Sequence, residues 1–302
     1  MVIRYCMDLS VLKSISNLLN QLVKETIKIC VDCQGLLSFS DLEFRCESCK
    51  RSYNCSDEGV WDFTQAEATR HEILSIYQEA EFMRWVDVFR KVESKNWYIY
   101  KNKLFRFFTE AGHRSLGRLL NKHITSRSLL LELGCGTGSL CKFVDCPNYV
   151  GVDISHEGLS LLKKKYPNAI AIQTSGENLP FAKSSYDYVV SLHTLEHIYR
   201  LGETLEQIRE ILVGNGFLFY GIPTEGGVLF RLGRRFFTGL HLRKTYDLDV
   251  NYVMDREHIN DANRVLKFLS IYFKKIKKVY WPFSILRMLN PNILVYGYCA
   301  KN

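Results

Sequence analysis

The sequence lacks long hydrophobic runs. No apolar stretch in its 302 residues approaches the ~18 residues that a membrane-spanning helix requires. The first residues also lack the unbroken apolar core of a signal peptide, because their apolar side chains recur at helical spacing instead. We therefore expect no membrane span and no secretion, and we expect a cytoplasmic protein with an N-terminal helix over residues 1–27.

Charge of one sign is in small excess. The chain has 40 Lys and Arg against 32 Asp and Glu, a net charge of +8, which permits an anionic partner without requiring nucleic acid.

Proline is absent between Phe63 and Pro147, and Thr64-x-x-Glu67 is a capping box, so residues 64–124 are expected to form a helical connector. We expect its many aromatic residues to pack as core; a less favoured alternative is that Tyr77 and Trp85 cover a pocket.

Ten cysteines without a secretion signal indicate metal binding or ordinary packing rather than disulfides. Four of them form two Cys-x2-Cys pairs separated by twelve residues: Cys30, Cys33, Cys46 and Cys49. This spacing predicts a zinc ribbon over residues 28–63, in which four thiolates close a structural site. A segment of about 40 residues has too small a core to fold without such a metal.

The stretch at residues 128–138, SLLLELGCGTG, predicts a buried strand followed by a tight glycine turn. We expect a helix from Ser139, with its free N–H groups facing the turn. The spacing of Gly134, Gly136 and Gly138 differs from the G-x-G-x-x-G of dinucleotide-binding proteins. An ordinary glycine turn is an equal alternative for this loop taken alone.

Further elements follow in a strand–helix–strand order. The second strand, 149–154, ends on Asp153, where an acid can accept both ribose hydroxyls of a nucleoside; the alternative is a capping carboxylate. The remaining strands are expected at 169–173, 186–192, 217–222, 276–283 and 293–300, and helices at 105–123, 157–166, 201–213 and 262–273.

The motif E-x-G-x-G-x-G beginning at Glu132, together with SGENLPFAKSSYDYVVSLHTLEHI over residues 175–198, resembles the class I S-adenosylmethionine-dependent methyltransferases of the ubiquinone-methylase-like type 11 group. The resemblance runs from about Leu116 to the C-terminus. It implies an α/β fold, a Rossmann-like, doubly wound sheet of seven strands with the last antiparallel, over residues 125–302.

The cofactor that the resemblance implies is S-adenosyl-L-methionine. The positions that match the binding residues of the family are Glu132, Gly134, Gly136, Gly138, Asp153, Ile154, Ser175, Gly176, Glu177 and Leu192. The family places an acid where this chain has Ser175, which can still accept the adenine amino group but without charge. The backbone N–H of Gly176 or of Glu177 is then the candidate donor to adenine N1.

The cysteine-containing segment is similar to the small zinc ribbon that activates some tRNA and protein methyltransferases and that also occurs fused ahead of bacterial methyltransferase domains. The usual Gly-hydrophobic-Pro-Asp-Phe ending appears here at 59–63, with Trp61 in place of proline. That difference does not affect the predicted metal ligands.

The fourth strand leads to His193, which we expect at the rim of the pocket. Neutral histidine can take a proton from an acceptor, so His193 and His258 are the candidate bases. A bystander role for His193 is as well supported, because alignment of the acceptor with the methyl group can suffice. We interpret His197 as a packing residue at a helix end rather than as a catalytic residue. We interpret Glu196 as a cap or salt-bridge residue.

An insert at 223–260 follows the fifth strand. Between Glu225 and Lys244 it has five basic residues against one acid, a net charge of +4, which suits either an acceptor-binding lid or a solvated basic face. We favour a small-molecule acceptor, such as a sugar or a phosphorylated or lipid-linked precursor, modified at O or N. RNA is the second candidate, and a non-enzymatic partner-binding module the third. Residues 30–63 of the ribbon have a net charge of −4, opposite in sign to a phosphate-binding surface.

Overall fold

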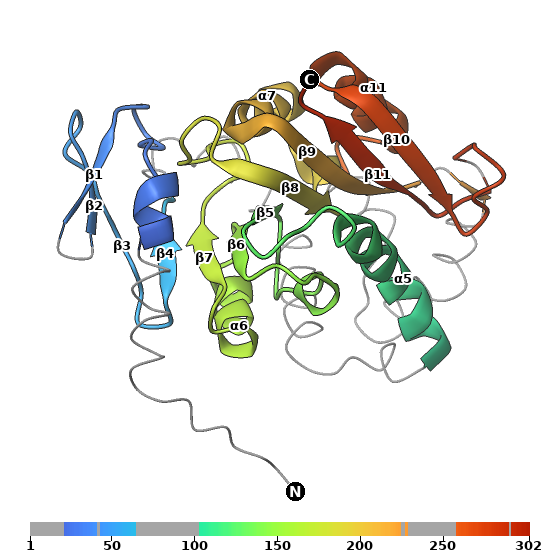
Figure 1. The fold of residues 1–302 in the computed structure, drawn as a ribbon, viewed down its shortest axis with the longest axis horizontal. Helices are drawn as coiled ribbons and strands as arrows, with labels where there is room; N and C mark the ends of the chain where they lie inside the picture. Colours follow the sequence, from blue (N-terminus) through green and yellow to red (C-terminus); the bar gives the residue numbers. More distant parts are fainter. Residues whose placement is uncertain (1–20, 41–42, 65–102, 225–226, 229–257, 290) are drawn as a thin grey trace, which may run out of the picture.

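The computed structural model describes residues 21–40, 43–64, 103–224, 227–228, 258–289 and 291–302 (Figure 1). Most of the N-terminal helix, the connector with Tyr77 and Trp85, and most of the basic insert lie outside this part of the chain. Within the described residues, no helix is long and apolar enough to cross a membrane.

The main sheet has eight strands in the order β10-β11-β9-β8-β5-β6-β7-β4. Their bounds are β4 Val60–Asp62, β5 Leu129–Leu133, β6 Asn148–Asp153, β7 Ile170–Gln173, β8 Tyr186–Leu192, β9 Leu212–Pro223, β10 Lys274–Trp281 and β11 Leu294–Ala300. Only β11 runs antiparallel to its neighbours, β9 and β10. The expected doubly wound sheet with an antiparallel last strand is therefore confirmed.

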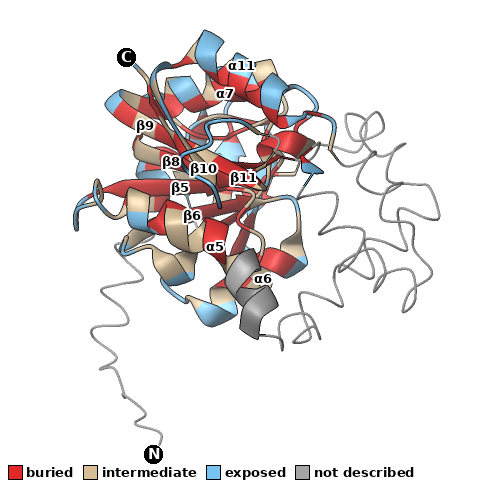
Figure 2. Cartoon of the chain, turned by 90° about the vertical axis from the view of Figure 1, so that its right-hand side faces the viewer, coloured by how far each residue is buried: buried red, intermediate tan, exposed pale blue. Residues whose placement is uncertain are grey.

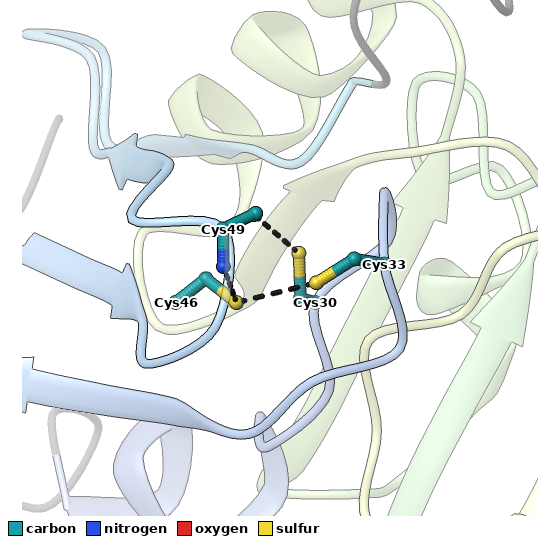
Figure 3. Close-up of side chains that lie close together, drawn as sticks. All are labelled: Cys30, Cys33, Cys46 and Cys49. Atoms are coloured by element: carbon teal, nitrogen blue, oxygen red, sulfur yellow. Dashed lines mark hydrogen bonds between the residues drawn. The ribbon is translucent and has the colours of Figure 1, made fainter.

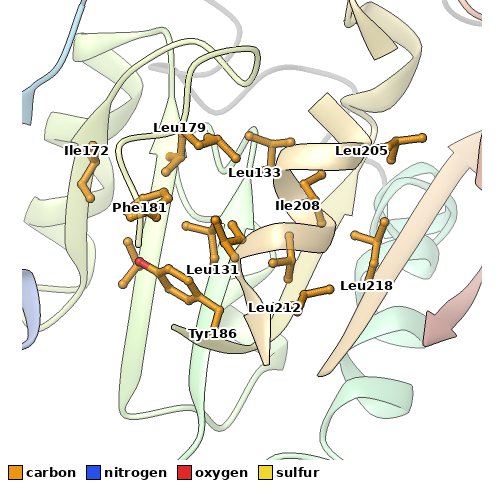
Figure 4. Packing of buried hydrophobic residues seen from close by; sticks show 14 of the residues in the cluster. Leu131, Leu133, Ile172, Leu179, Phe181, Tyr186, Leu205, Ile208, Leu212 and Leu218 are labelled. Atoms are coloured by element: carbon orange, nitrogen blue, oxygen red, sulfur yellow. The ribbon is translucent and has the colours of Figure 1, made fainter. Parts of the chain in front are cut away.

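Helices cover both faces of the sheet. Their bounds are α5 Lys103–Leu120, α6 His156–Lys165, α7 Leu201–Ile211 and α11 Ala262–Tyr272. Alternate residues of β5 point into two cores: Leu131 packs with the α7 and α11 side, and Leu130 with the α5 and α6 side. Figure 4 shows part of the first core, and Figure 2 shows buried central strands beneath the exposed outer surfaces of α7 and α11.

The cysteine-containing segment forms a small antiparallel sheet of β1 Leu37–Ser40, β2 Glu43–Cys46 and β3 Ser52–Asn54. Strand β4 then leaves this sheet and pairs in parallel with β7, where Val60 lies opposite Ala171. A second attachment is made by Lys28 and Ile29, whose N–H groups donate to the Pro180 carbonyl at 2.9 and 3.1 Å. The ribbon thus contributes an eighth strand to the seven that the sequence predicted.

Trp61, at the position where the zinc ribbons that this segment resembles have proline, lies in β4 and is buried. Its ring lies 5.3 Å from that of Phe44 and 5.9 Å from that of Phe39, and Phe63 stacks on Tyr53 at 4.6 Å. These aromatic rings form the core of the ribbon against the main sheet. The substitution therefore adds apolar packing where the ribbon meets the sheet.

Two sequence expectations differ from the structure. The helix expected from Ser139 is wrong, since only a 3-10 turn, η1 Cys141–Phe143, follows the glycine loop. Pro147 and the start of β6 leave too few residues there for an amphipathic helix. Helix α7 also ends at Ile211, and β9 begins at Leu212, before the expected start at Phe217.

Candidate functional site

The glycine loop follows β5 with backbone angles that favour glycine. Gly134, Gly136 and Gly138 have φ values of 72°, 48° and 77°. A Cβ atom on Gly134 would lie 2.1 Å from Thr194 Oγ1, and one on Gly138 would lie 2.4 Å from Leu162 Cδ1. The loop is therefore held in close contact with the residues after β8 and with α6, and two of its three glycines have no room for a side chain.

Asp153 connects the end of β6 to the glycine loop. Its Oδ2 accepts a hydrogen bond from Gly136 N, and its Oδ1 accepts one from Ser155 N, both at 2.8 Å. Burial raises the pKa of Asp153. Each carboxylate oxygen has a second acceptor direction, which two neighbouring hydroxyl groups can use. Ile154, next in the chain, has 60% of its surface exposed although it is large and apolar.

The loop after β7 contains the three residues assigned to the adenine. Glu177 N donates to Ser175 Oγ at 3.2 Å, and Glu177 Oε1 accepts from Arg200 N at 2.9 Å. Both groups of Glu177 are therefore used within the protein. Gly176 is buried against Ile198 and Leu133, whose side-chain atoms would lie 3.1 Å from an added Cβ. In this conformation Gly176 N–H is a better candidate donor than Glu177 N–H.

Glu132 lies behind the glycine loop, on the α5 and α6 side of the sheet. It is only 3% exposed, and its carboxylate accepts a hydrogen bond from the Tyr149 hydroxyl. Burial raises the pKa of Glu132 to about 8; the Tyr149 hydrogen bond opposes this rise, and the negative charge of Asp153 adds to it. Leu192, also among the expected contacts, is buried at the end of β8.

The pKa of Glu132 predicts how stability depends on pH. A folded-state pKa above the ordinary value means that stability is full below about 4.5 and falls as pH rises toward about 8. The loss from this group is about 1.4 kcal/mol per pH unit in that window. Denaturant unfolding at a series of pH values between about 4.5 and 8 should show this fall in the free energy of unfolding for the wild type. For Glu132→Gln the free energy of unfolding should depend less on pH. Glu203→Gln, at an exposed carboxyl, is the control, and equal slopes in wild type and Glu132→Gln would contradict the prediction.

His193 directly follows β8 and has a φ of 56°, unusual for a residue with a side chain. Its N–H donates to the Gly221 carbonyl at 3.0 Å, and its side chain is 42% exposed. Partial desolvation and the nearby His113, His197 and His258 lower the pKa of His193. The imidazole is therefore neutral at physiological pH, but it is a weak base.

A group of acid and histidine side chains beyond His193 was not recognised from the sequence. The ligand atoms of Glu196, His197 and His258 lie within 4.8 Å of one another. His113 of α5 also approaches, with its ring 6.1 Å from that of His193. The only sequence signal was the dense histidine content of the segment after β8, which packing explained equally well.

The four cysteines of the two Cys-x2-Cys pairs converge (Figure 3). The Sγ atoms of Cys30 and Cys49 are 3.7 Å apart, and those of Cys33 and Cys46 are 3.5 Å apart. Four neighbouring thiolates can occupy all four positions of a tetrahedral metal ion. The cluster can therefore hold a metal ion, as the spacing predicted.

The two cysteine pairs have matching backbone turns. Gln34, after the first pair, and Lys50, after the second, have φ values of 60° and 66°. Each residue's N–H donates to the carbonyl of the first cysteine of its pair, at 3.0 and 3.1 Å. Burial raises the pKa of the Cys46 thiol, but the N–H groups of Cys49 and Ser48 and the side chains of Cys33 and Cys49 together outweigh it and lower that pKa, while the pKa of the neighbouring Cys49 thiol is raised. The turns thus favour thiolate at this position.

Residues 131–220, from β5 to most of β9, match the family described as a methyltransferase domain. This part of the chain is a methyltransferase domain. The match includes the glycine loop, Asp153 and the segment from 175 to 198, which are the residues that carry the resemblance in the sequence.

Solved structures are similar to the methyltransferase domain and its surroundings. A possible histamine N-methyltransferase from Thermotoga maritima is 15% identical with a TM-score of 0.47, over 76% of this chain and 100% of that chain. A putative methyltransferase from Methanococcus maripaludis is 15% identical with a TM-score of 0.48, over 72% of this chain and 91% of that chain. A chain from a Haloferax volcanii complex of the Trm112 methyltransferase activator and a putative methyltransferase is 12% identical with a TM-score of 0.43. The match covers 65% of this chain and 92% of that chain. No curated protein matches the sequence.

Proposed function

We propose that the protein methylates an oxygen or nitrogen of a small-molecule acceptor. S-adenosylmethionine supplies an electrophilic methyl group. On this proposal Asp153 accepts the ribose hydroxyls, Ile154 covers one face of the adenine, and Ser175 with Gly176 N–H binds its edge. The support is the glycine loop, which is fixed to Asp153 by the 2.8 Å bond from Gly136 N and has no room for side chains at Gly134 and Gly138.

The proposal includes a structural zinc ion on Cys30, Cys33, Cys46 and Cys49. Four thiolates fill a tetrahedral site and leave no position for a substrate, so this metal would act only on stability. The matching turns at Gln34 and Lys50 support a preformed site for such an ion.

The observation that carries the small-molecule assignment is the position and charge of the ribbon. Strand β4 places it at the β7 edge of the sheet, while the insert leaves the sheet after β9, on the other side of β5. Residues 30–63 contain three basic and seven acidic side chains. An extended RNA surface reaching the ribbon would meet like charge there.

His193 is proposed to contact the acceptor at the rim of the site. Its lowered pKa keeps it neutral and makes proton transfer to it weak, so we assign it mainly to orienting the acceptor. The alternative base from the sequence, His258, lies next to His197, with ring centroids 4.5 Å apart.

The acceptor assignment predicts a kinetic effect of the insert's charge. Arg234→Ala with Arg235→Ala should raise the acceptor KM about tenfold, equivalent to about 1.4 kcal/mol of binding, and leave S-adenosylmethionine affinity unchanged. The acceptor itself would come from a mass-spectrometric assay offering cell-wall sugars, small metabolites and total RNA in parallel. Arg209→Ala, on the exposed surface of α7, is the control.

RNA binding by the wild type provides the opposing test. A small-molecule enzyme should bind RNA only weakly at low salt, and the binding should vanish near physiological ionic strength. Tight binding that persists there, with methyl transfer to a defined nucleotide, would replace this proposal with an RNA methyltransferase.

A further inference from the structure

We propose that Glu196, His197 and His258 form a second metal site, separate from the cysteine cluster, which takes a first-row divalent cation such as Zn²⁺ at the rim of the methyl-transfer site. The three residues belong to two segments far apart in the sequence. Glu196 and His197 lie in the 3-10 turn η2 Leu195–His197 after β8, and His258 precedes α11.

The first support is the geometry of the three side chains. Each offers one ligand atom, and these atoms lie within 4.8 Å of one another. The rings of His197 and His258 have centroids 4.5 Å apart and are nearly perpendicular, at 89°. The three donor atoms would move closer together to reach the ~2.0–2.2 Å bond lengths of a zinc ion.

The second support is the way in which the backbone holds the two segments together. Asn260 is 1% exposed, and its Nδ2 donates to the carbonyls of Leu195 at 3.2 Å and Ile198 at 2.6 Å. Its N–H also donates to the Glu196 carbonyl at 3.0 Å. These three bonds fix His258 against the turn that carries Glu196 and His197. The donor set is therefore built by the fold rather than by mobile surface side chains.

The third support is the chemistry of the set. Glu196 is 1% exposed, and its carboxylate is an anionic oxygen ligand that lies beside two imidazoles. Histidine is the most common cation ligand in proteins, and two histidines with one carboxylate suit zinc or iron and leave coordination positions open. The cysteine cluster, in contrast, has four protein ligands and no open position.

The position of the site suggests the class of acceptor. Nδ1 of His193 lies 3.8 Å from Glu196 Oε1, so the cluster adjoins the residue that we place beside the acceptor. A divalent cation with open positions can bind two oxygen donors, which vicinal hydroxyls or a hydroxyl next to a carboxylate would supply. This part of the inference rests on the proposed function; the metal site itself does not.

The test is cobalt titration of the full-length, metal-depleted protein, followed by optical spectroscopy. Cobalt bound by cysteine shows thiolate-to-metal charge transfer in the near ultraviolet, whereas cobalt bound by histidine and carboxylate shows only visible ligand-field bands. We expect a first equivalent with charge transfer and a second equivalent without it. His258→Ala and Glu196→Gln should each lose the second equivalent and retain the first.

Two further variants complete the design. His156→Ala, at the start of α6, should bind both equivalents, and Cys33→Ser should weaken only the first. A wild-type protein that binds a single, thiolate-type equivalent would overturn the proposal, and so would a second equivalent unaffected in both Glu196→Gln and His258→Ala. Calorimetry with S-adenosylmethionine on the same samples distinguishes failure of the metal-site proposal from failure of the proposed function. A protein that binds S-adenosylmethionine but no second cobalt ion would contradict the metal site alone.

Discussion

The Gly136→Val variant is expected to bind S-adenosylmethionine at least about a hundredfold more weakly than the wild type, equivalent to about 2.7 kcal/mol. Gly136 has a φ of 48°, which a β-branched residue rarely adopts. Its N–H also donates to Asp153 Oδ2 at 2.8 Å, so a shift of the loop moves the residue that we assign to the ribose. Calorimetric titration of the donor measures the effect directly.

Matched variants separate binding from folding in this experiment. Gly214→Val introduces the same side chain where the nearest neighbouring atom, Asn302 Nδ2, is 4.0 Å from the added Cβ, and it should bind normally. Asp153→Ala should lose binding, and Asp153→Asn should retain part of it because one acceptor oxygen remains. If Gly136→Val and Asp153→Ala both bind like the wild type, the cofactor site is assigned to the wrong loop.

Loss of the cysteine-bound metal is expected to unfold the ribbon. The double variant Cys30→Ser with Cys46→Ser removes one metal ligand from each cysteine pair. It should lower the free energy of unfolding by several kcal/mol, since structural zinc can contribute about 10–16 kcal/mol of binding free energy. Limited proteolysis should then cleave within residues 28–63, and elemental analysis should show loss of the thiolate-bound ion. Thermal unfolding should also begin at a lower temperature.

Cys55→Ser provides the control for this variant, because Cys55 is exposed and lies outside both pairs. It should keep the metal, the protease resistance and the melting temperature of the wild type. A metal-free preparation whose N-terminal segment remains folded and protease-resistant would show that the aromatic core around Trp61 suffices without an ion.

The features predicted correctly from the sequence depend on local patterns. The continuous apolar runs at β5, β6, β7 and β8 identify strands buried on both faces, and the glycines after β5 mark a turn that needs positive φ. The pairs of cysteines are similarly local, because each turn is set by four or five consecutive residues. The positions assigned to cofactor contacts remain predictions, although the loops that carry them lie at the expected strand ends.

The features that were missed depend on contacts between distant segments. Nothing in the three residues of β4 indicates that they pair with β7 rather than with β3. The approach of His258 to His197 results from Asn260, whose hydrogen bonds to η2 span more than 60 residues of sequence. The helix expected after the glycine loop was an error of another kind, because the short distance to β6 overrides a favourable helix start.

The pairing of β4 with β7 has a consequence for the order of folding. Val60 meets Ala171 more than a hundred residues further along the chain, so the ribbon emerges from the ribosome well before its partner strand exists. Contacts of such long sequence separation form late and slow folding. During this interval the ribbon can be stabilised only by contacts within itself, its small sheet and its aromatic rings, and by a metal ion. Zinc supply at the time of synthesis would then influence how much of the nascent chain reaches the complete sheet.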